Sequence, residues 1–591
     1  MARAKKEVNE VTLESQNPSI AKPRLIKLFV KNFRCIGSVP VEIDLDDIVV
    51  LVGPNNAGKS TILRAYELAM NQGSNLGKIT IDDFPSGILN TRECPEIELH
   101  TVIYDETVGA QWINEIEGEK IVKEKWVWTA PGDPKRQGYD ATSSSWSENV
   151  PWGAPNVANS KRPQPHKVDA FADPKVQADE IVKILESVLK DRVKQFQISK
   201  IEESSEEQSE YEKLLSNIKE IQNKIIKDAS TEIDRIETEI SSLVSKVFTG
   251  YRVKFDARPE EDLDKAVNLF KAGSQLLMGP EGGYLSNIER QGSGARRTLL
   301  WTALKYISES GISKKVVQSE RPHVLLLDEP ELCLHPNAIR EACNVLYELP
   351  SSGNWQVMVT THSPAFIDLS RDNTTIVRVE KNNSGNIQGT TLFRPKTAKL
   401  DENDRSNLKL LNACDPYVAE FFFGGKSVIV EGDTEYSAFK YLISENPEKY
   451  KDIHIIRARG KAIICSLVKI LNQFESQYSI LHDSDKPFNS NQTRNSAWTV
   501  NQNIMDSKKM HVNNEKVRLI ALIPNFEQAF FSLDVKSDKP YNAIENIKNS
   551  EAHSIKVLSL LDSLVNHSCE VPEMCLEWKD LDELEAIVNK K

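Results

Sequence analysis

Apolar and polar positions along the chain recur with two periods, which together predict an α/β protein. The run 25–33 (LIKLFVKNF) alternates with a period of two, as a half-buried strand does. Shorter apolar runs predict further strands at 41–45, 48–52, 323–329, 357–360, 427–431, 453–456, 478–485 and 517–523. We expect the first three of these strands to lie in one sheet.

Helical spacing fills several intervals between these strands. Apolar residues recur at steps of three and four in 60–70, 298–307 and 463–474, and again in three runs within 174–248. The last of these runs, over 233–247, is a heptad seam of only two repeats. Two arrangements of this helical insertion stay open: amphipathic helices packed on the neighbouring domain, or a protruding coiled-coil arm.

Length and composition indicate a multidomain protein without membrane segments. The chain has 591 residues, of which 39% are hydrophobic and 27% charged. No apolar run approaches the ~18 residues of a membrane span, and the N-terminal residues lack the apolar core of a signal peptide, so we expect a cytoplasmic protein. The eight cysteines form no C-x-x-C pair, which argues against a disulfide framework and a structural zinc site. The segment 130–170 is rich in Pro, Gly, Ser and Asn, which predicts a long surface excursion.

Charge is distributed unevenly along the chain. The net charge of −12 does not exclude a nucleic-acid partner, because binding depends on the local charge of a groove. Residues 1–34 carry eight Lys or Arg against three Glu. The basic tail at 1–24 is therefore either an arm that grips phosphates or a solvated tail. A second basic turn, at 457–461, is either suited to backbone phosphates or merely exposed.

The segment 49–61 (VVLVGPNNAGKST) contains a complete phosphate-binding loop between a predicted strand and a predicted helix. Its residues fit the pattern G-x-x-x-x-G-K-[ST]. In such a loop, backbone amides surround the phosphates of ATP, the lysine reaches the β and γ oxygens, and the serine hydroxyl is a ligand of Mg²⁺. The residues that we expect to bind the nucleotide are Gly53, Asn55, Asn56, Gly58, Lys59, Ser60 and Thr61.

The predicted strand at 323–329 (HVLLLDE) supplies the acidic half of the nucleotide site. It ends in Asp328 and Glu329, far beyond the loop in sequence, so the chain must fold back to bring the two halves together. We expect Asp328 to hold Mg²⁺, and Glu329 to orient and deprotonate the attacking water.

Four motifs in this order resemble the ABC-type ATPase heads of the SMC, RecF and OLD group. They are the phosphate-binding loop, GSGAR at 292–296, DEPELCLHP after the acidic strand, and TTHSP around His362. The resemblance implies that His362 contacts the γ-phosphate, and that Ser293 completes the ATP site of a neighbouring protomer in a homodimer of heads. A tetramer stays open. Arg296 departs from the glutamine that is commoner at the end of the GSGAR-type signature.

Two further predicted strands end in carboxylates. Glu431 ends the strand in SVIVEGDTE, and Glu435 shares its face if a helix begins there. Asp483 and Asp485 end the strand in YSILHDSD, two residues apart and so on one side. Carboxyl ends of parallel strands meet at one edge of a sheet, and carboxylate oxygens select Mg²⁺ or Mn²⁺. We expect these four residues to hold the metal, and Glu431, Asp483 and Asp485 also to carry catalysis.

Together these acids resemble the TOPRIM domain of topoisomerases, primases and OLD-family nucleases. An ABC-type head followed by TOPRIM resembles the OLD (overcoming lysogenization defect) family over about 25–550. The extra acid Glu435, and Pro487 where other TOPRIM domains carry a third acid, favour the nuclease branch. The resemblance implies that Glu527 is a later metal ligand and that Lys539 stabilises the phosphorane or the leaving oxygen.

The resemblance implies an enzyme that binds and hydrolyses ATP and cleaves DNA with Mg²⁺ or Mn²⁺, with ATP as control. It also implies anti-phage defence, beside a helicase or a retron reverse transcriptase with its DNA. The alternative is an SMC- or RecF-like DNA-tethering ATPase without nuclease activity. We expect an ABC-type P-loop head at 25–422, a TOPRIM α/β domain at 423–550, and a C-terminal helical segment at 551–591 that is a docking surface or a cap on TOPRIM.

Overall fold

The computed structural model describes residues 23–104, 108–168, 250–256, 275–309 and 322–590, apart from gaps of one to four residues in the last range, and parts of 175–182 and 224–245. The tail at 1–22 and most of the expected helical insertion lie outside the described residues. Within the described part of the chain, no helix is long and apolar enough to cross a membrane.

An antiparallel sheet forms the outer layer of the N-terminal unit. Its strand order is β2, β1, β4, β6, β7, β8, with β5 beside β6. Buried and more exposed residues alternate along β6, as expected for a sheet with one covered face. The strands are β1 (Arg24–Lys31), β2 (Val41–Asp44), β4 (Glu96–Ile103), β5 (Asn114–Ile116), β6 (Glu119–Val127), β7 (Lys135–Asp140) and β8 (Ser145–Ser147).

A second, mainly parallel sheet forms the centre of this unit, in the order β16, β15, β3, β14, β13, β9. All its neighbouring pairs are parallel except β15 with β16. The strands are β3 (Ile48–Val52), β9 (Gln164–Val168), β13 (His323–Asp328), β14 (Trp355–Thr360), β15 (Thr374–Lys381) and β16 (Ile387–Phe393).

The central sheet is covered on both faces. Along β3, Val49 and Leu51 pack with α1 (Lys59–Met70) and the antiparallel sheet, whereas Ile48, Val50 and Val52 belong to the core that contains α5 (Ser293–Glu309) and α6 (Pro336–Glu348). This alternation follows from the two-residue period of a strand. Every residue of β3 is therefore buried, which explains its unbroken apolar run.

The expectation that the first three strands share a sheet is wrong. The strands β1 and β2 pair with each other, and β1 pairs with β4, all antiparallel. The strand β3 lies between β14 and β15 in the parallel sheet. The sequences of β1 and β3 differ in a way that agrees with this separation. Residues of β1 alternate and leave one face half-exposed, whereas β3 is apolar throughout and needs cover on both faces.

The structure also differs from the expected surface excursion at 130–170. This segment contains β7, β8, α2 (Pro155–Ser160) and β9, and β9 is an edge strand of the central sheet beside β13. The fully buried Arg162 donates two hydrogen bonds of 2.7 Å to the Glu124 carboxylate on β6. This buried charged pair ties the segment to the fold. The Pro and Gly residues mark tight turns between short elements. A segment of this kind has the same composition as a long loop.

The described end of the helical insertion packs on the N-terminal unit. Ile233, Ile236, Ile240 and Val244 are buried in the same core as α5. A small sheet lies beside it, made of β10 (Tyr251–Asp256), β11 (Gln275–Pro280) and β12 (Ser286–Asn287). For this end of the insertion, helices packed on the domain are observed. The rest of the insertion lies outside the described residues.

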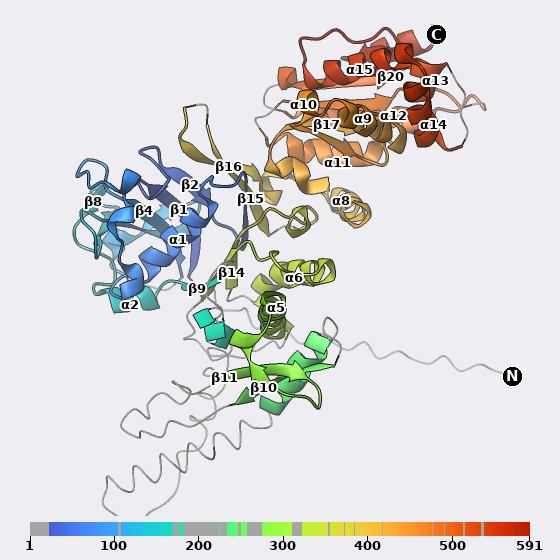
Figure 1. The fold of residues 1–591 in the computed structure, drawn as a ribbon. Helices are drawn as coiled ribbons and strands as arrows, with labels where there is room; N and C mark the ends of the chain where they lie inside the picture. The colour runs from blue at the N-terminus through green and yellow to red at the C-terminus, as the bar shows by residue number, and fades with distance from the viewer. Residues whose placement is uncertain are drawn as a thin grey trace, which may run out of the picture.

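The C-terminal unit is a five-stranded sheet between two layers of helices, drawn in orange and red in Figure 1. The order is β18, β17, β19, β20, β21, and only β21 is antiparallel. The strands are β17 (Lys426–Val430), β18 (Ile453–Arg457), β19 (Tyr478–Asp483), β20 (Val517–Leu522) and β21 (Cys575–Glu577). The helices are α9 (Asp433–Glu445), α10 (Pro447–Tyr450), α11 (Lys461–Leu471), α12 (Ser496–Lys509), α13 (Phe526–Phe531), α14 (Lys539–Asn549), α15 (Glu551–Val565) and α16 (Leu581–Val588).

The last forty residues belong to this unit and are not purely helical. The helix α15 packs on the sheet in the same core as α9, α13 and α14. The strand β21 pairs with β20 as the fifth strand. Trp578, fully buried after β21, donates a hydrogen bond of 3.1 Å to His482 on β19. The expected helices are present as α15 and α16, and α15 covers one face of the sheet, as the alternative of a cap implies. The strand β21 was not expected, because three residues are too few to leave a periodic signal.

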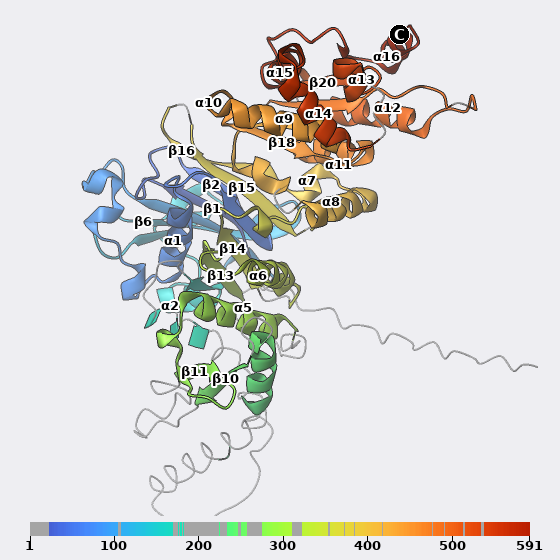
Figure 2. The ribbon, with the colours of Figure 1, turned by 45° about the vertical axis from the view of Figure 1, so that its right-hand side comes forward.

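The two units are joined through α7 (Pro395–Ala398) and α8 (Glu402–Cys414), and α8 packs against α11 (Figure 2). Asp404 on α8 accepts a hydrogen bond of 2.8 Å from the buried Ser466 hydroxyl on α11 and also pairs with Lys469. One continuous apolar core extends from the central sheet of the N-terminal unit to α11 and α12. The units are therefore packed together and not merely tethered.

Candidate ATP and metal sites

The loop between β3 and α1 has the conformation that its glycines allow. Gly53 has φ +135°, and a Cβ there would lie 2.1 Å from the carbonyl oxygen of Val379. Gly58, with φ +98°, is the residue before α1. No larger side chain fits the first position, and both backbone angles favour glycine. The loop ends at the N-terminus of α1, and the backbone amides at a helix N-terminus are a site where anions bind.

Lys59 is buried at the base of this loop, with 5% of its surface exposed. Its Nζ donates to the carbonyl oxygens of Gly53 (3.0 Å) and Pro54 (2.9 Å) and lies 3.0 Å from Nε2 of His362. Burial lowers the pKa of Lys59, against the opposing effect of the acids at the end of β13. Burial, and next the charge of Lys59, lower the pKa of His362. Because a lysine ammonium group can only donate, Nε2 of His362 is the acceptor of this hydrogen bond.

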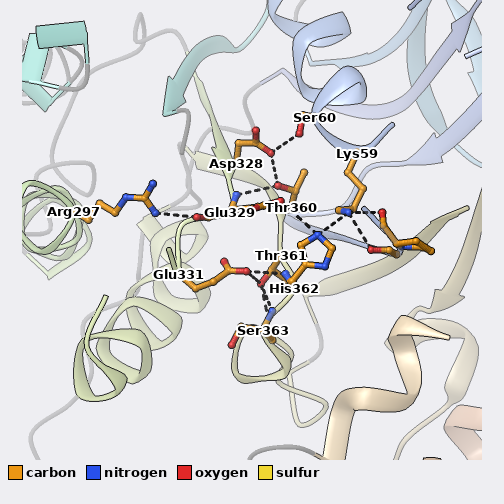
Figure 3. A network of polar contacts seen from close by, with 12 residues as sticks. Lys59, Ser60, Arg297, Asp328, Glu329, Glu331, Thr360, Thr361, His362 and Ser363 are labelled. Atoms are coloured by element: carbon orange, nitrogen blue, oxygen red, sulfur yellow. Dashed lines mark hydrogen bonds and ion pairs between the residues drawn. The ribbon is translucent and has the colours of Figure 1, made fainter. Parts of the chain in front are cut away.

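The structure brings the predicted Mg²⁺ ligands Ser60 and Asp328 together (Figure 3). Oδ1 of Asp328 accepts hydrogen bonds from the Ser60 hydroxyl (2.8 Å) and from the Thr360 hydroxyl at the end of β14 (2.6 Å). The N–H of Glu329 donates to the Thr360 hydroxyl at 3.0 Å. Three segments far apart in sequence thus meet at one carboxylate. Sequence reasoning missed Thr360, which the TT of TTHSP could have indicated.

Glu329 faces the same space in an unusual backbone conformation, with φ 43°. Its Oε1 lies 3.5 Å from Nε2 of His362. Its carbonyl oxygen accepts a hydrogen bond of 2.9 Å from Nη1 of Arg297 on α5. Positive φ is uncommon for glutamate and is retained where the surroundings fix it. Arg297, which sequence reasoning also missed, is part of that fixation.

Glu331 positions the histidine loop. Its Oε1 accepts hydrogen bonds from the backbone N–H of His362 (2.7 Å) and the hydroxyl of Thr361 (2.8 Å). Burial raises the pKa of this carboxyl. The second glutamate of DEPE thus has an observed structural contact, whereas the sequence assigned it no role.

A cavity of about 880 Å³ lies over these residues. It is lined by Cys35, Asn55, Asn56, Ala57, Gly58, Lys59, Ser60, Thr61, Glu329, Glu331, Leu332, His362, Ser363 and Pro364. Ser293 is not one of the lining residues; it begins α5, and a Cβ at Gly294 would lie 2.8 Å from the carbonyl oxygen of Cys333. Of the expected nucleotide-binding residues, Gly53, Ser293 and Asp328 do not line the cavity, and all the others do. Gly53 and Asp328 are hydrogen-bonded to the lining residues Lys59 and Ser60.

The second group of acids lies at the carboxyl ends of β17 and β19, which are neighbouring parallel strands. Oε2 of Glu431 accepts a hydrogen bond of 3.0 Å from the backbone N–H of Asp483. Glu435 lies in the first turn of α9 and is 4% exposed. Oε2 of Glu435 and Oδ1 of Asp483 are buried without a hydrogen-bond partner. Buried carboxylate oxygens are rarely left unpaired, so a proton, a water molecule or a cation would meet the requirement of both atoms for a partner.

The electrostatics of these acids agree with that requirement. Burial, followed by the charges of Glu435 and Glu431, raises the pKa of Asp483 well above its usual range. Burial, followed by the charges of Glu431 and Glu527, raises the pKa of Glu435 to about 7. Burial also raises the pKa of Glu431. A cation among these groups would stabilise their ionised forms and displace protons.

Asp485 lies beyond the end of β19 with φ 61°, so the alternation of a strand does not orient it. Its Oδ2 pairs with Nζ of Lys461, at the start of α11. Lys461 also donates a hydrogen bond of 2.9 Å to Oδ1 of the fully buried Asn501. In the basic turn at 457–461, Lys461 thus points inward and Arg457 pairs with Asp433 at 2.9 Å, whereas Arg459 is exposed.

Glu527 and Lys539 lie together at the same edge. Oε1 of Glu527, in the first turn of α13, is 3.2 Å from Nζ of Lys539 and accepts a hydrogen bond of 3.3 Å from the Thr434 hydroxyl. Among the described residues, no three His, Cys, Asp or Glu side chains are arranged to hold an ion as they stand. Two of the five acids, Asp485 and Glu527, are paired with lysines, which partly explains why the carboxylates are not gathered around one point. The unpaired oxygens and raised pKa values nevertheless fit a divalent cation.

The fold and the two sites define a P-loop ATPase head packed against a TOPRIM domain, as the sequence predicted. The family model described as "AAA ATPase domain" matches residues 24–198 and 156–367. The model described as "Overcoming lysogenization defect protein-like, TOPRIM domain" matches residues 422–485. The chain therefore belongs to the AAA ATPase domain family and, with the TOPRIM domain that follows, has the composition of an OLD-family protein.

Two curated relatives span nearly the whole chain. The Old nuclease of Escherichia phage P2 is 25% identical over an alignment of 563 residues that covers 90% of this chain and 88% of that protein. The OLD nuclease of Thermus scotoductus is 23% identical over an alignment of 548 residues that covers 89% of this chain and 95% of that protein. A solved Smc head domain from Pyrococcus furiosus, with a coiled coil and the C-terminal domain of ScpA, matches with a TM-score of 0.39 and 16% identity, over 64% of this chain and 98% of that one.

Proposed function

We propose that this protein binds and hydrolyses ATP in its head and cleaves DNA in its TOPRIM domain, as a Mg²⁺- or Mn²⁺-dependent endonuclease. The observation that carries the proposal is the pair of buried, unpartnered carboxylate oxygens on Glu435 and Asp483 at the TOPRIM strand ends. The names of the two curated relatives support the same reaction. A tethering ATPase has no use for such a costly cluster of buried acids.

The residues that would hold the metal are Glu431, Glu435, Asp483, Asp485 and Glu527. When bound, the metal supplies an activated water and stabilises the leaving oxygen during phosphodiester cleavage. The backbone N–H of Asp483 fixes the Glu431 carboxylate at the strand ends. Lys539, whose side chain is 43% exposed beside Glu527, lies where it can neutralise charge on a phosphate that enters from solvent.

In the head, Lys59 is placed to exchange its carbonyl partners for the β and γ oxygens of ATP. Ser60 and Asp328 would hold Mg²⁺, and Glu329 would orient and deprotonate water, with His362 beside it at the γ-phosphate. Ser293 of a second protomer would complete each site. The active form in this proposal is a homodimer of heads around ATP.

The proposed setting is cytoplasmic anti-phage defence. A helicase, or a retron reverse transcriptase with its DNA, is the class of partner that would direct the nuclease to its substrate. In this setting ATP turnover by the head controls cleavage. The proposed route is the contact of α8 with α11, because α11 begins at Lys461 beside the acid cluster.

The direct test is cleavage of plasmid DNA by the purified full chain. With Mg²⁺ or Mn²⁺ we expect nicked and linear products, and with EDTA in excess we expect none, because the acids alone cannot activate water. Products that form equally well in EDTA would refute the metal-dependent reaction. Intact plasmid at every metal and nucleotide condition, from a protein that hydrolyses ATP, would favour the tethering ATPase.

Control by ATP can be tested at the junction. Asp404→Asn removes the ion pair with Lys469 and weakens the bond to Ser466. We expect ATP hydrolysis and metal-dependent cleavage each to stay within about threefold of wild type, at a stability cost of roughly 1–3 kcal/mol. The ratio of cleavage rates with and without ATP should move towards one. Glu402→Gln, at an exposed position of the same helical turn, is the matched control, and an unchanged ratio in Asp404→Asn would contradict this route.

A further inference from the structure

A lysine lies inside the acidic edge of the TOPRIM domain, where no role is assigned to it. Lys461 is 6% exposed, and its Nζ contacts the Asp485 carboxylate and the Asn501 amide oxygen. The Asn501 amide nitrogen donates to the carbonyl oxygen of Ser484 at 3.0 Å, which fixes which end of the amide faces the lysine. The ammonium group is therefore held in place by two protein acceptors and is not a mobile group in solvent.

The turn that precedes Lys461 is bonded to the other strand end of the acid cluster. The N–H of Gly460, the residue before α11, donates to the carbonyl oxygen of Glu431 at 3.0 Å. The charge of Lys461 acts to lower the pKa values of Glu431 and Asp483, against the larger effect of burial. Three of the acids that would hold a metal thus interact with this one fixed cation.

A fixed cation and a metal ion compete when they use the same carboxylate. Asp485 cannot pair fully with Lys461 and also ligate a divalent cation with the same oxygen. An ammonium inside the cluster also repels the ion through a low-dielectric region. On the other hand, it reduces the mutual repulsion of the acids before metal enters.

We propose that Lys461 is a positioning residue of the TOPRIM site, whose ammonium group holds Asp485 and competes with the divalent cation for that carboxylate. The proposal rests on the proposed function, because it takes the acid cluster to be the metal site. It accounts for the dispersion of the acids in the structure: Asp485 is turned to Lys461, and its release is part of metal loading.

The test is Mn²⁺ binding to the full chain without nucleotide or DNA, measured by calorimetry or by the loss of the free-ion paramagnetic resonance signal. Lys461→Met keeps the length of the side chain and removes its charge. We expect it to bind Mn²⁺ about tenfold more tightly than wild type. Lys461→Arg keeps the charge and should stay near wild type. Lys449→Met, which removes a lysine from an exposed pair with Asp562, is the matched control for net charge.

A double-mutant cycle then tests the route. If Lys461 acts through Asp485, the gain from Lys461→Met should shrink in the Asp485→Asn background. Thermal unfolding checks that each variant is folded, and Lys461→Gln replaces Lys461→Met if the latter is not. Unchanged or weaker Mn²⁺ binding by a folded, uncharged variant would overturn the proposal. Wild-type binding that Glu431→Ala leaves intact would instead mean that the ion is held elsewhere, and that result counts against the proposed function.

Discussion

Asp483→Ala is expected to reduce DNA cleavage by roughly a thousandfold or more while ATP hydrolysis continues near the wild-type rate. Asp483 ends β19, its Oδ1 is buried without a partner, and its backbone N–H holds Glu431. Removal of the carboxylate takes one ligand from the centre of the cluster. The head has its own ligands on β13 and the phosphate-binding loop, so its chemistry does not depend on this residue.

The measurement is plasmid cleavage and phosphate release recorded on the same preparation. Asp506→Ala, an exposed aspartate on α12, is the matched control and should cleave like wild type. Asp485→Asn is the stricter variant, because it keeps the shape and weakens one ligand. Partial recovery at high Mn²⁺ is expected if Asp485 touches the ion. Loss of both activities in Asp483→Ala would mean that the acid supports the fold or couples the units.

Lys59→Ala is expected to abolish ATP hydrolysis, by roughly a thousandfold, because it removes the buried charge that the β and γ oxygens would meet. Glu329→Gln should behave differently. Its amide keeps the size of the side chain but cannot take a proton from water, so ATP binds and is not turned over. We expect the trapped nucleotide to enrich a dimer of heads.

Phosphate release and particle size by light scattering, each with and without ATP, separate the two variants. Lys78→Ala, an exposed position in the same unit, is the control for Lys59→Ala. Wild-type hydrolysis by Glu329→Gln would contradict its assignment as the base. A monomer that persists in Glu329→Gln with ATP would contradict the dimer that Ser293 is expected to complete.

The phosphate-binding loop and the acidic strand ends could be predicted because their signals are local. Residues 48–52 are a strand in the structure as expected, and the helix begins at Lys59, one position before the predicted start. The approach of Ser60 to Asp328 follows from the parallel order of β3, β14 and β13, which places their carboxyl ends at one edge. The motifs predict the strand ends, and the parallel sheet brings those ends together, so the contact of Ser60 with Asp328 could be predicted.

Other features of the fold depend on contacts between distant residues, which a local sequence pattern does not predict. The separation of β1 and β2 from β3 is decided by which faces are covered. The strand β9 looks like loop in sequence because its partner β13 comes about 160 residues later, and Arg162 finds Glu124 across the sheet. From its sequence context, Lys461 belongs to a basic turn that could be exposed. In the structure it is buried, because it contacts Asn501 and Asp485. Its burial is a property of the packed unit and not of the turn.

The measurement that tests the central claim most directly is a comparison of wild type and Glu431→Ala in one reaction that contains plasmid, Mn²⁺ and ATP. Cleaved DNA and released phosphate are followed in the same tube. The account predicts that Glu431→Ala hydrolyses ATP at nearly the wild-type rate and leaves the plasmid intact, since the two reactions use separate acids. Cleavage of the plasmid by Glu431→Ala at the wild-type rate would contradict a nuclease site at the TOPRIM strand ends.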